Sequence, residues 1–331
     1  MSKPYQVASL FAGIGGICTG FRQAGAEIAW ANEIDKYACE TYREFYGNPS
    51  YLQEGDIYKM HVPKDTHIDI VAAGFPCQAF SIAGYRKGFE DERGVLYTQV
   101  LRTIEETDPA AVFLENVKNL KNHDGGNTYR VIRESLEAKH YAVTEKVLNT
   151  MDYGNIPQNR ERIYVVAFKE DSPGSKHSKM MDNFSFPDPV ELTCKLSDVI
   201  DYHEKKADKF YYQKDHMYYK KLDTAMTNPD TVYQWRRVYV RENKSGVCPT
   251  MTANMGCGGH NVPIIRDDFG IRKLTPQECL RLQGFPSDLK FPESMADSHK
   301  YKQAGNSVSV PVIKRIAEKM IEAMDSDKHV Q

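Results

Sequence analysis

Residues 68–78 read IDIVAAGFPCQ, an apolar run followed by a glycine, a proline and a cysteine. The apolar run is too short for an isolated helix and is typical of a buried strand. Pro76 has no N–H group to donate to a β-ladder, so the strand should end before it. Because α/β sheets bind ligands at the carboxyl ends of their strands, Cys77 is predicted to face a substrate.

The residues after Cys77 favour a catalytic role for it. Residues 81–88 (SIAGYRKG) form a polar, glycine-spaced loop. A thiol beneath a loop that closes suits a nucleophile shielded from water. The alternative is that Cys77 is a small, buried, hydrophobic residue, as most cysteines are. The chain has six other cysteines, Cys18, Cys39, Cys194, Cys248, Cys257 and Cys279.

Segments of strand and helix character alternate through the first half of the chain. Strands are predicted at residues 7–11, 27–32, 68–73, 111–114, 142–148 and 163–168, and helices at 36–46, 96–106 and 128–139 and from the first glycine-rich turn to about Gly25. Asp35 is predicted to cap the second helix. Alternation with short loops predicts an α/β fold with a parallel, doubly wound sheet and helices on both faces.

The alternation ends near Ser172. Residues 172–188 are rich in Ser, Pro, Lys and Met and resemble a surface linker, whereas residues 192–265 are irregular and aromatic. Residues 310–324 regain helical spacing and should pack back on the first domain. We therefore expect a large domain of residues 1–190 plus 300–331, a smaller, irregular and β-rich domain of residues 191–290, and a hinge at 291–299.

The composition is that of an ordinary globular protein: 331 residues, 41% hydrophobic and 27% charged, with a net charge of −2. No apolar segment suggests a signal peptide or a membrane span. The 7 cysteines form no CxxC pair, which predicts no metal site and reduced thiols in the cytoplasm. Residues 195–261 hold eleven Lys/Arg against eight Asp/Glu together with many aromatics, which suits a solvated surface as well as a nucleic-acid groove.

Three features in the first 60 residues suit an adenosine cofactor. A glycine-rich turn, residues 11–16 (FAGIGG), follows the first strand and permits close approach of a ligand. Glu33 ends the next strand, where a carboxylate can accept from two ribose hydroxyls. Asp56 follows in a loop and suits an adenine amino group. The alternatives are a tight turn, a solvated strand end for Glu33 and a turn residue at Asp56.

Two further motifs carry charge toward the same sheet edge. Glu115 follows the strand at 111–114, where a water-poor setting would raise its pKa and let it act as an acid. Arg160 and Arg162 alternate before the strand at 163–168 and should project to one side. Otherwise Glu115 is a helix N-terminal acid and the arginines form ion pairs with neighbours such as Glu161.

In this order the motifs make the chain resemble the C5 DNA cytosine methyltransferases of bacterial restriction–modification systems, over nearly its whole length. The resemblance rests on the turn at 11–16, Glu33, Asp56, Pro76-Cys77-Gln78, Glu115-Asn116-Val117, Gln158-x-Arg160-x-Arg162, residues 272–286 (RKLTPQECLRLQGFP) and Gly305-Asn306-Ser307-Val308. It implies a Rossmann-like methyltransferase domain and a separate target-recognition domain.

The resemblance also implies roles in catalysis. Cys77, next to Gln78 of the same motif, would attack C6 of a cytosine that is flipped out of duplex DNA. Glu115 would protonate N3, Arg162 would contact the base carbonyl, and Arg160 would lie near the nucleophile. The methyl group would come from S-adenosylmethionine, leaving S-adenosylhomocysteine, and a water would remove the C5 proton.

Binding residues follow from the same resemblance. The implied cofactor contacts are Phe11, Ala12, Gly13, Ile14, Gly16, Glu33, Ile34, Asp56, Ile57, Pro76, Leu96, Asn306 and Val308. The implied DNA contacts are Ser81 in a closing loop, Gln234 filling the vacated stack, Arg237, and Thr250 near the phosphate. We expect a bacterial cytoplasmic monomer that acts on a short duplex site, with a restriction endonuclease as a functional partner and with no metal and no membrane.

One departure from the family pattern is visible, and three other interpretations stay open. Residues 153–157 (YGNIP) are one residue longer than the usual Tyr-Gly-Ile-Pro. The main alternative is a tRNA cytosine-5 methyltransferase, although the Cys-Phe-Thr run of that subfamily is absent. A nicotinamide oxidoreductase would leave Cys77 and Glu115 without a role, and a non-catalytic relative would have lost the nucleophile.

Overall fold

The computed structural model describes residues 3–75, 96–257 and 261–328. Its main feature is a seven-stranded sheet with the strand order β3-β2-β1-β4-β5-β8-β6. These strands are β1 (Gln6–Leu10), β2 (Glu27–Glu33), β3 (Leu52–Glu54), β4 (Ile70–Ala73), β5 (Ala111–Val117), β6 (Tyr141–Asn149) and β8 (Glu161–Lys169). The order reverses between β1 and β4, which creates the crevice where such sheets bind ligands.

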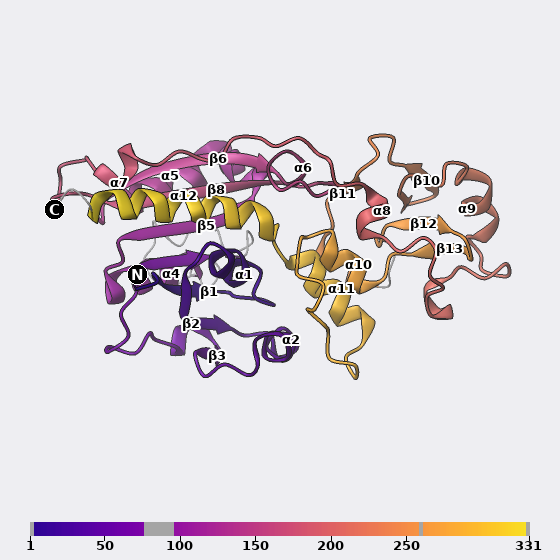
Figure 1. The fold of residues 1–331 in the computed structure, drawn as a ribbon, viewed down its shortest axis with the longest axis horizontal. Helices are drawn as coiled ribbons and strands as arrows, with labels where there is room; N and C mark the ends of the chain where they lie inside the picture. The colour runs from indigo at the N-terminus through magenta and orange to yellow at the C-terminus, as the bar shows by residue number, and fades with distance from the viewer. Residues whose placement is uncertain (1–2, 76–95, 258–260, 329–331) are drawn as a thin grey trace.

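Helices cover both faces of this sheet, as expected from the alternation (Figure 1). One face packs against α1 (Gly16–Gln23) and α12 (Val310–Lys328) through Phe21 and Ile316. The other packs against α4 (Leu96–Thr107) and α5 (Asn127–Glu137) through Val100 and Ile132. The C-terminal helix therefore returns to the first part of the chain, and the α/β doubly wound fold is confirmed.

The expectation of an entirely parallel sheet was wrong in one strand. β8 runs antiparallel to both β5 and β6. The physical reason is the short connection between β6 and β8, which holds only the four-residue α6 (Thr150–Tyr153) and β7 (Gln158–Asn159). A parallel neighbour needs a crossover of a dozen or more residues, usually a helix, whereas a short return gives an antiparallel pair.

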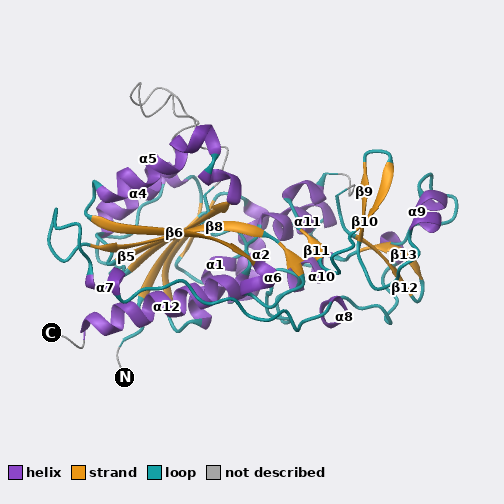
Figure 2. Ribbon diagram, turned by 90° about the horizontal axis from the view of Figure 1, so that it is seen from above, coloured by secondary structure: helices purple, strands orange, loops and turns teal. Residues whose placement is uncertain are grey.

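The segment that follows forms a smaller, mainly β-structured part at the other end of the molecule (Figure 2). Its sheet has the order β10-β9-β12-β13. The strands are β9 (Tyr233–Arg236), β10 (Tyr239–Glu242), β12 (Ile264–Asp267) and β13 (Gly270–Lys273). β11 (Cys248–Pro249) instead pairs with β7, so this segment is joined to the end of the β6–β8 connection.

Short helices complete the structure. They are α2 (Lys36–Tyr46), α7 (Lys179–Asp182), α8 (Leu196–Val199), α9 (Tyr219–Ala225), α10 (Pro276–Arg281), α11 (Asp297–Asn306), η1 (Ile57–Lys59), η3 (Lys118–Lys121), η4 (His123–Gly126), η5 (Asp208–Phe210) and η6 (Ala253–Gly256). The Asp35 side chain accepts from the backbone of Tyr37 and caps α2, as predicted. Within the described part of the chain, no helix is long and apolar enough to cross a bilayer.

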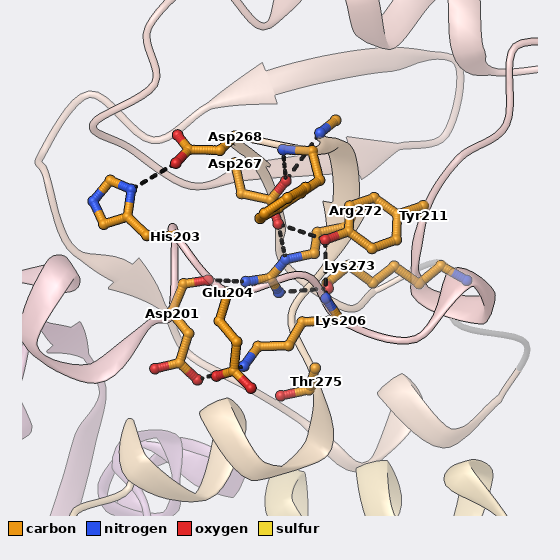
Figure 3. A network of polar contacts seen from close by, with 12 residues as sticks. Asp201, His203, Glu204, Lys206, Tyr211, Asp267, Asp268, Arg272, Lys273 and Thr275 are labelled. Atoms are coloured by element: carbon orange, nitrogen blue, oxygen red, sulfur yellow. Dashed lines mark hydrogen bonds and ion pairs between the residues drawn. The ribbon is translucent and has the colours of Figure 1, made fainter.

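The fully buried Arg272 organises the smaller part (Figure 3). Its guanidinium donates to both carboxylate oxygens of Glu278 at 2.8 Å and to Asp267 Oδ2 at 2.5 Å. It also donates to the Asp201 carbonyl, and Tyr211 donates to Asp267 at 2.9 Å. Because each carboxylate is paired, the network links the β12–β13 hairpin, α10 and the chain near residue 201 without an unpaired buried charge.

Candidate active site

A cavity of about 560 Å³ lies at the carboxyl ends of β1, β2, β4 and β5. Its lining contains every described residue that the resemblance implies for the cofactor, together with the three charged residues implied for catalysis. These are Phe11, Ala12, Gly13, Ile14, Gly16, Glu33, Ile34, Asp56, Ile57, Leu96, Asn306, Val308, Glu115, Arg160 and Arg162. Residues far apart in sequence thus share one hollow at the topological switch point.

The glycine-rich turn and the end of β2 hold one another in place. Glu33 Oε2 accepts from the backbone N–H of Gly13, and Oε1 accepts from those of Ile34 and Asp35, all at 2.8 Å. Gly13 has φ +57°, and a Cβ built on it would meet no atom within 4 Å. The turn therefore presents bare backbone to the cavity, and Glu33 Oε2, which accepts one hydrogen bond, keeps a lone pair for a hydroxyl donor.

The neighbouring wall is partly apolar. The Ile34 side chain is 66% exposed although it is large and hydrophobic, which suits contact with a flat ring. Asp56 caps η1 by accepting from the Tyr58 N–H at 3.1 Å, so its role as a turn residue applies alongside its place in the cavity. Arg102 of α4 donates to the carbonyls of Ile57 and Met60 and braces this wall from behind.

Glu115 and Arg162 lie at the other end of the cavity. Glu115 is 7% exposed, and Arg162 Nε lies 3.2 Å from its Oε1 without the alignment of a hydrogen bond. Burial raises the pKa of Glu115, although the positive charges of Arg162 and Arg160 oppose that rise. No described residue donates a hydrogen bond to Oε1, which is buried beside the Arg162 guanidinium.

The Arg160 side chain donates hydrogen bonds to backbone carbonyls. Its guanidinium donates to the Met251 carbonyl at 2.8 Å and to the Ser307 carbonyl. Burial, with the adjacent Arg162 charge, lowers the pKa of Arg160 to about 9. Arg160 therefore connects the β7–β8 corner with residues after β11 and after α11. The sequence allowed one of the two arginines to brace the site, but it did not indicate these backbone partners.

The segment 305–308 packs against the glycine turn at very short range. A Cβ on Gly16 would lie 2.6 Å from Val308 Cγ2, and one on Gly305 would lie 2.1 Å from the Thr252 carbonyl oxygen. Both positions need the absence of a side chain. The last motif thus closes the cavity against both the first turn and the β11–η6 segment.

A second hollow, of about 800 Å³, opens beside Arg162 and contains Gln234 and Thr250. Thr250 donates to the Asn159 carbonyl at 2.7 Å. Arg237 lies on an adjoining hollow of about 670 Å³ with Trp235 and Tyr239. These predicted DNA contacts, which come from the smaller part, therefore lie on adjoining surfaces next to the cavity.

Some predicted residues lie outside the described residues, namely Pro76, Cys77, Gln78 and Ser81. The structure does place what precedes them, because β4 pairs with β5 and Asn116 Nδ2 donates to the Phe75 carbonyl at 2.8 Å. Asn116 belongs to a motif of the sequence that assigned it no role. Its amide holds the chain one residue before Pro76, a contact that only the strand pairing reveals.

The extra residue of the 153–157 segment has a local explanation. Asn155 adopts φ +49°, a left-handed conformation that Asn tolerates better than most residues. Its side-chain oxygen accepts from the N–H groups of Thr193 and Cys194 at 2.8 and 3.0 Å. The insertion thus ties down the chain that enters the smaller part, and β7 and β8 still bring Arg160 and Arg162 to the cavity.

Comparison with known proteins identifies this constellation. The model of the family described as C-5 cytosine-specific DNA methylase matches residues 5–322. The chain belongs to this family. A relative of 53% identity is the Type II methyltransferase M.Bsp6I of Bacillus sp. (strain RFL6), matched over 96% of this chain and 99% of that protein.

A second relative agrees with this chain in length, and a solved structure agrees with it in fold. The Type II methyltransferase M.HhaI of Haemophilus parahaemolyticus is 38% identical over 93% of this chain and 91% of its own. A solved DNMT2 mutant of Spodoptera frugiperda, 19% identical, has a TM-score of 0.72 and covers 96% of this chain and 99% of that one, which shows the shared fold. The chain is therefore a DNA cytosine-5 methyltransferase of the Type II kind, in a family that uses S-adenosylmethionine.

Proposed function

We propose that the enzyme rotates one cytosine out of a short duplex DNA site and methylates its C5 through a transient bond between Cys77 and C6. One observation carries this proposal: Arg162 lines both the hollow that holds Gln234 and Thr250 and the cavity that holds Glu33 and Asp56. A base contacted from the first hollow would thus reach a cofactor in the second. A base inside the duplex would be inaccessible, which is why rotation is needed.

The residues present fit S-adenosylmethionine. Glu33 suits the ribose hydroxyls, the exposed Ile34 and the η1 wall of Asp56 and Ile57 suit the adenine, and the bare Gly13 backbone with Asn306 suits the amino-acid end. The other cavity-lining residues of the glycine turn complete the contacts, with Pro76 and Leu96 near the reacting end. S-adenosylmethionine, when bound, supplies an electrophilic methyl group.

Glu115 and Cys77 act together on the base. Glu115 donates a proton to cytosine N3 while the Cys77 thiolate adds to C6, which turns C5 into a nucleophile. The raised pKa of Glu115 favours the protonated carboxyl that this step needs. Arg162 donates to the base carbonyl, and Arg160 and Gln78 support the nucleophile's loop. After methyl transfer a water removes the C5 proton and Cys77 leaves as thiolate, and N3 returns its proton to Glu115, which restores the ring.

The same proposal assigns the surrounding parts. Residues 191–290 read the DNA with Gln234, Arg237 and Thr250, residues 1–190 and 300–331 carry the chemistry, and residues 291–299 join them. Ser81 lies in the loop that closes over the base. The enzyme works as a monomer in the bacterial cytoplasm, alongside a restriction endonuclease that cuts the same site and forms no stable complex with it.

The test is methyl transfer from labelled S-adenosylmethionine to mixed-sequence duplex DNA and to tRNA, followed by mapping of 5-methylcytosine. Label at one short recurring DNA sequence is expected, and label confined to tRNA would assign the enzyme to the RNA-modifying alternative. Cys77→Ser should abolish turnover and retain cofactor binding. Methylation by this variant would exclude the covalent mechanism.

A further inference from the structure

The β9–β10 hairpin has two chemically distinct faces. The strand register places Arg236 opposite Tyr239 and Gln234 opposite Arg241. Because alternate residues of a strand share a face, these four side chains lie on one side of the hairpin. The other side carries Tyr233 and Trp235, which pack into a buried cluster with Leu222 and Met226.

That buried side holds the hairpin in one shape. Tyr218 stacks on Trp235 with the ring centroids 4.1 Å apart, and Trp235 Nε1 donates to the Arg237 carbonyl at 3.0 Å. The turn of Arg237 and Val238 is fixed in this way, with Arg237 at φ +55°. Figure 2 shows β9 and β10 projecting from the smaller part as a two-stranded ribbon. On its polar face Arg236, Tyr239 and Arg241 are exposed, whereas Gln234 is buried.

The arginines of this face have no partner among the described residues. Neither Arg236 nor Arg241 makes a hydrogen bond or ion pair within residues 3–75, 96–257 and 261–328, and both are exposed. By contrast Arg266, on β12 of the same sheet, pairs with Asp223 at 2.8 Å. Two free guanidinium groups beside Gln234, in the hollow that reaches Arg162, indicate a ligand outside the chain.

The spacing of the face suits base edges. Cross-strand neighbours are about 5 Å apart and alternate residues of one strand about 7 Å apart, whereas successive base pairs rise by about 3.4 Å. Arg236 and Arg241 therefore reach base pairs one or two steps from the position that Gln234 faces. A two-stranded ribbon fits the major groove, and the arginine fork pairs with O6 and N7 of guanine.

We propose that Arg236 and Arg241 determine sequence specificity, each by reading one guanine within two base pairs of the target cytosine. This inference rests on the proposed function, because it needs the hairpin to face duplex DNA. It adds the content of the recognition site: two positions at which guanine is required.

The experiment methylates a library of duplexes with randomised positions around a cytosine and sequences the methylated products, using the full-length enzyme and the Arg236→Lys and Arg241→Lys variants. Lysine keeps the charge and loses the fork. We expect guanine at two positions for the unchanged enzyme, and each variant should relax its preference at one of them by roughly 5- to 150-fold. The salt dependence of DNA binding should stay the same.

Arg266→Lys is the matched control and should leave both preferences intact. Circular dichroism and S-adenosylmethionine binding verify that each variant is folded. Arg236→Gln and Arg241→Gln remove the charge as well as the guanidinium fork. If these variants weaken all sequences equally and reduce the salt slope by about 1, the arginines contact phosphates and the inference fails while the methyltransferase assignment stands. If the unchanged enzyme labels no DNA, both fail together.

Discussion

At the scale of single residues, Glu115 shows how burial and charge compete. Burial raises its pKa, and the two neighbouring arginines fail to reverse that rise. The ion pair with Arg162 is poorly aligned, so one carboxylate oxygen stays unused. A residue placed for structure alone would have this oxygen satisfied, because an unpaired buried acceptor costs stability.

Replacing Glu115 by Gln should remove the proton donor and keep the shape of the side chain. We expect methyl transfer to fall by roughly 100-fold or more, the usual contribution of a positioned acid, with little change in cofactor binding. Single-turnover rates and equilibrium binding measure the two effects. Glu134→Gln on α5, an exposed partner of Arg130, is the control. Equal rates for the two variants would exclude Glu115 as the acid.

The raised pKa of Glu115 also predicts a pH-dependent stability. Between its ordinary value of 4.5 and the raised folded value, the folded state binds more protons than the unfolded state. The free energy of unfolding therefore falls as the pH rises through this window. Thermal unfolding should show the melting temperature of Glu115→Gln rising relative to that of the unchanged protein from pH 4.5 upward. A constant difference would contradict the assigned burial.

At the scale of elements, close approach of backbones joins α11 to the β11–η6 segment. Gly305 lies where any Cβ would meet the backbone of Thr252 and Ala253, with atoms at 2.1, 2.2 and 2.6 Å. Gly305→Ala should destabilise the protein by about 1–3 kcal/mol, because backbone atoms cannot rotate away as a side chain can. Urea unfolding measures the loss. Gly246→Ala, at φ +70° in open space, should cost only about 1–2 kcal/mol of backbone strain.

Arg272 and Arg281 both form ion pairs in the smaller part, but Arg272 is fully buried and Arg281 is not. Arg272→Met leaves the carboxylates of Asp267 and Glu278 buried without their cation and should cost about 3–5 kcal/mol. Arg281→Met breaks a pair with Asp201 whose side chains are 26% and 32% exposed, and should cost about 1 kcal/mol or less. Urea unfolding compares the variants. Similar losses for both would show that the network stabilises less than its burial implies.

The sequence predicted the positions of helices and strands better than the direction of strands and the contacts between elements. Periodicity located α2 and α12 closely because their apolar spacing and the Asp35 cap are local signals. The antiparallel direction of β8 depends on how the chain returns through residues 150–160, and strand character alone does not encode direction. Likewise, motif order brought Glu33 and Glu115 to one cavity, whereas the backbone partners of Arg160 required the packed structure.

At the scale of the whole molecule, the smaller part shares its core with the larger one. The hydrophobic cluster around Val232 and Leu280 also contains Ile14 of the glycine turn, Ala38 of α2, and Tyr301 and Ala304 of α11. These outlying residues are buried. Composition predicts a domain of residues 191–290, but the hydrophobic cluster of this part also includes residues outside that range.

A fragment of residues 191–290 should therefore fail to fold alone. Without Ile14, Ala38 and Tyr301 its cluster is exposed to water, and so small a unit depends on apolar burial for most of its stability. Proton NMR of the fragment should show narrow amide dispersion, with the full-length chain as the folded reference. A well-dispersed spectrum would show an independent domain.

The pairing of β7 with β11 has a practical consequence for protein engineering. Chimaeric enzymes are commonly made by exchanging one contiguous segment. Here a cut on either side of residues 191–290 would separate Cys248 and Pro249 from the two residues that immediately precede Arg160, and would leave Gly305 without the Thr252 backbone on which it packs. A transplant that is to change the sequence read and keep the enzyme active must carry residues 157–160 and 295–308 with the segment.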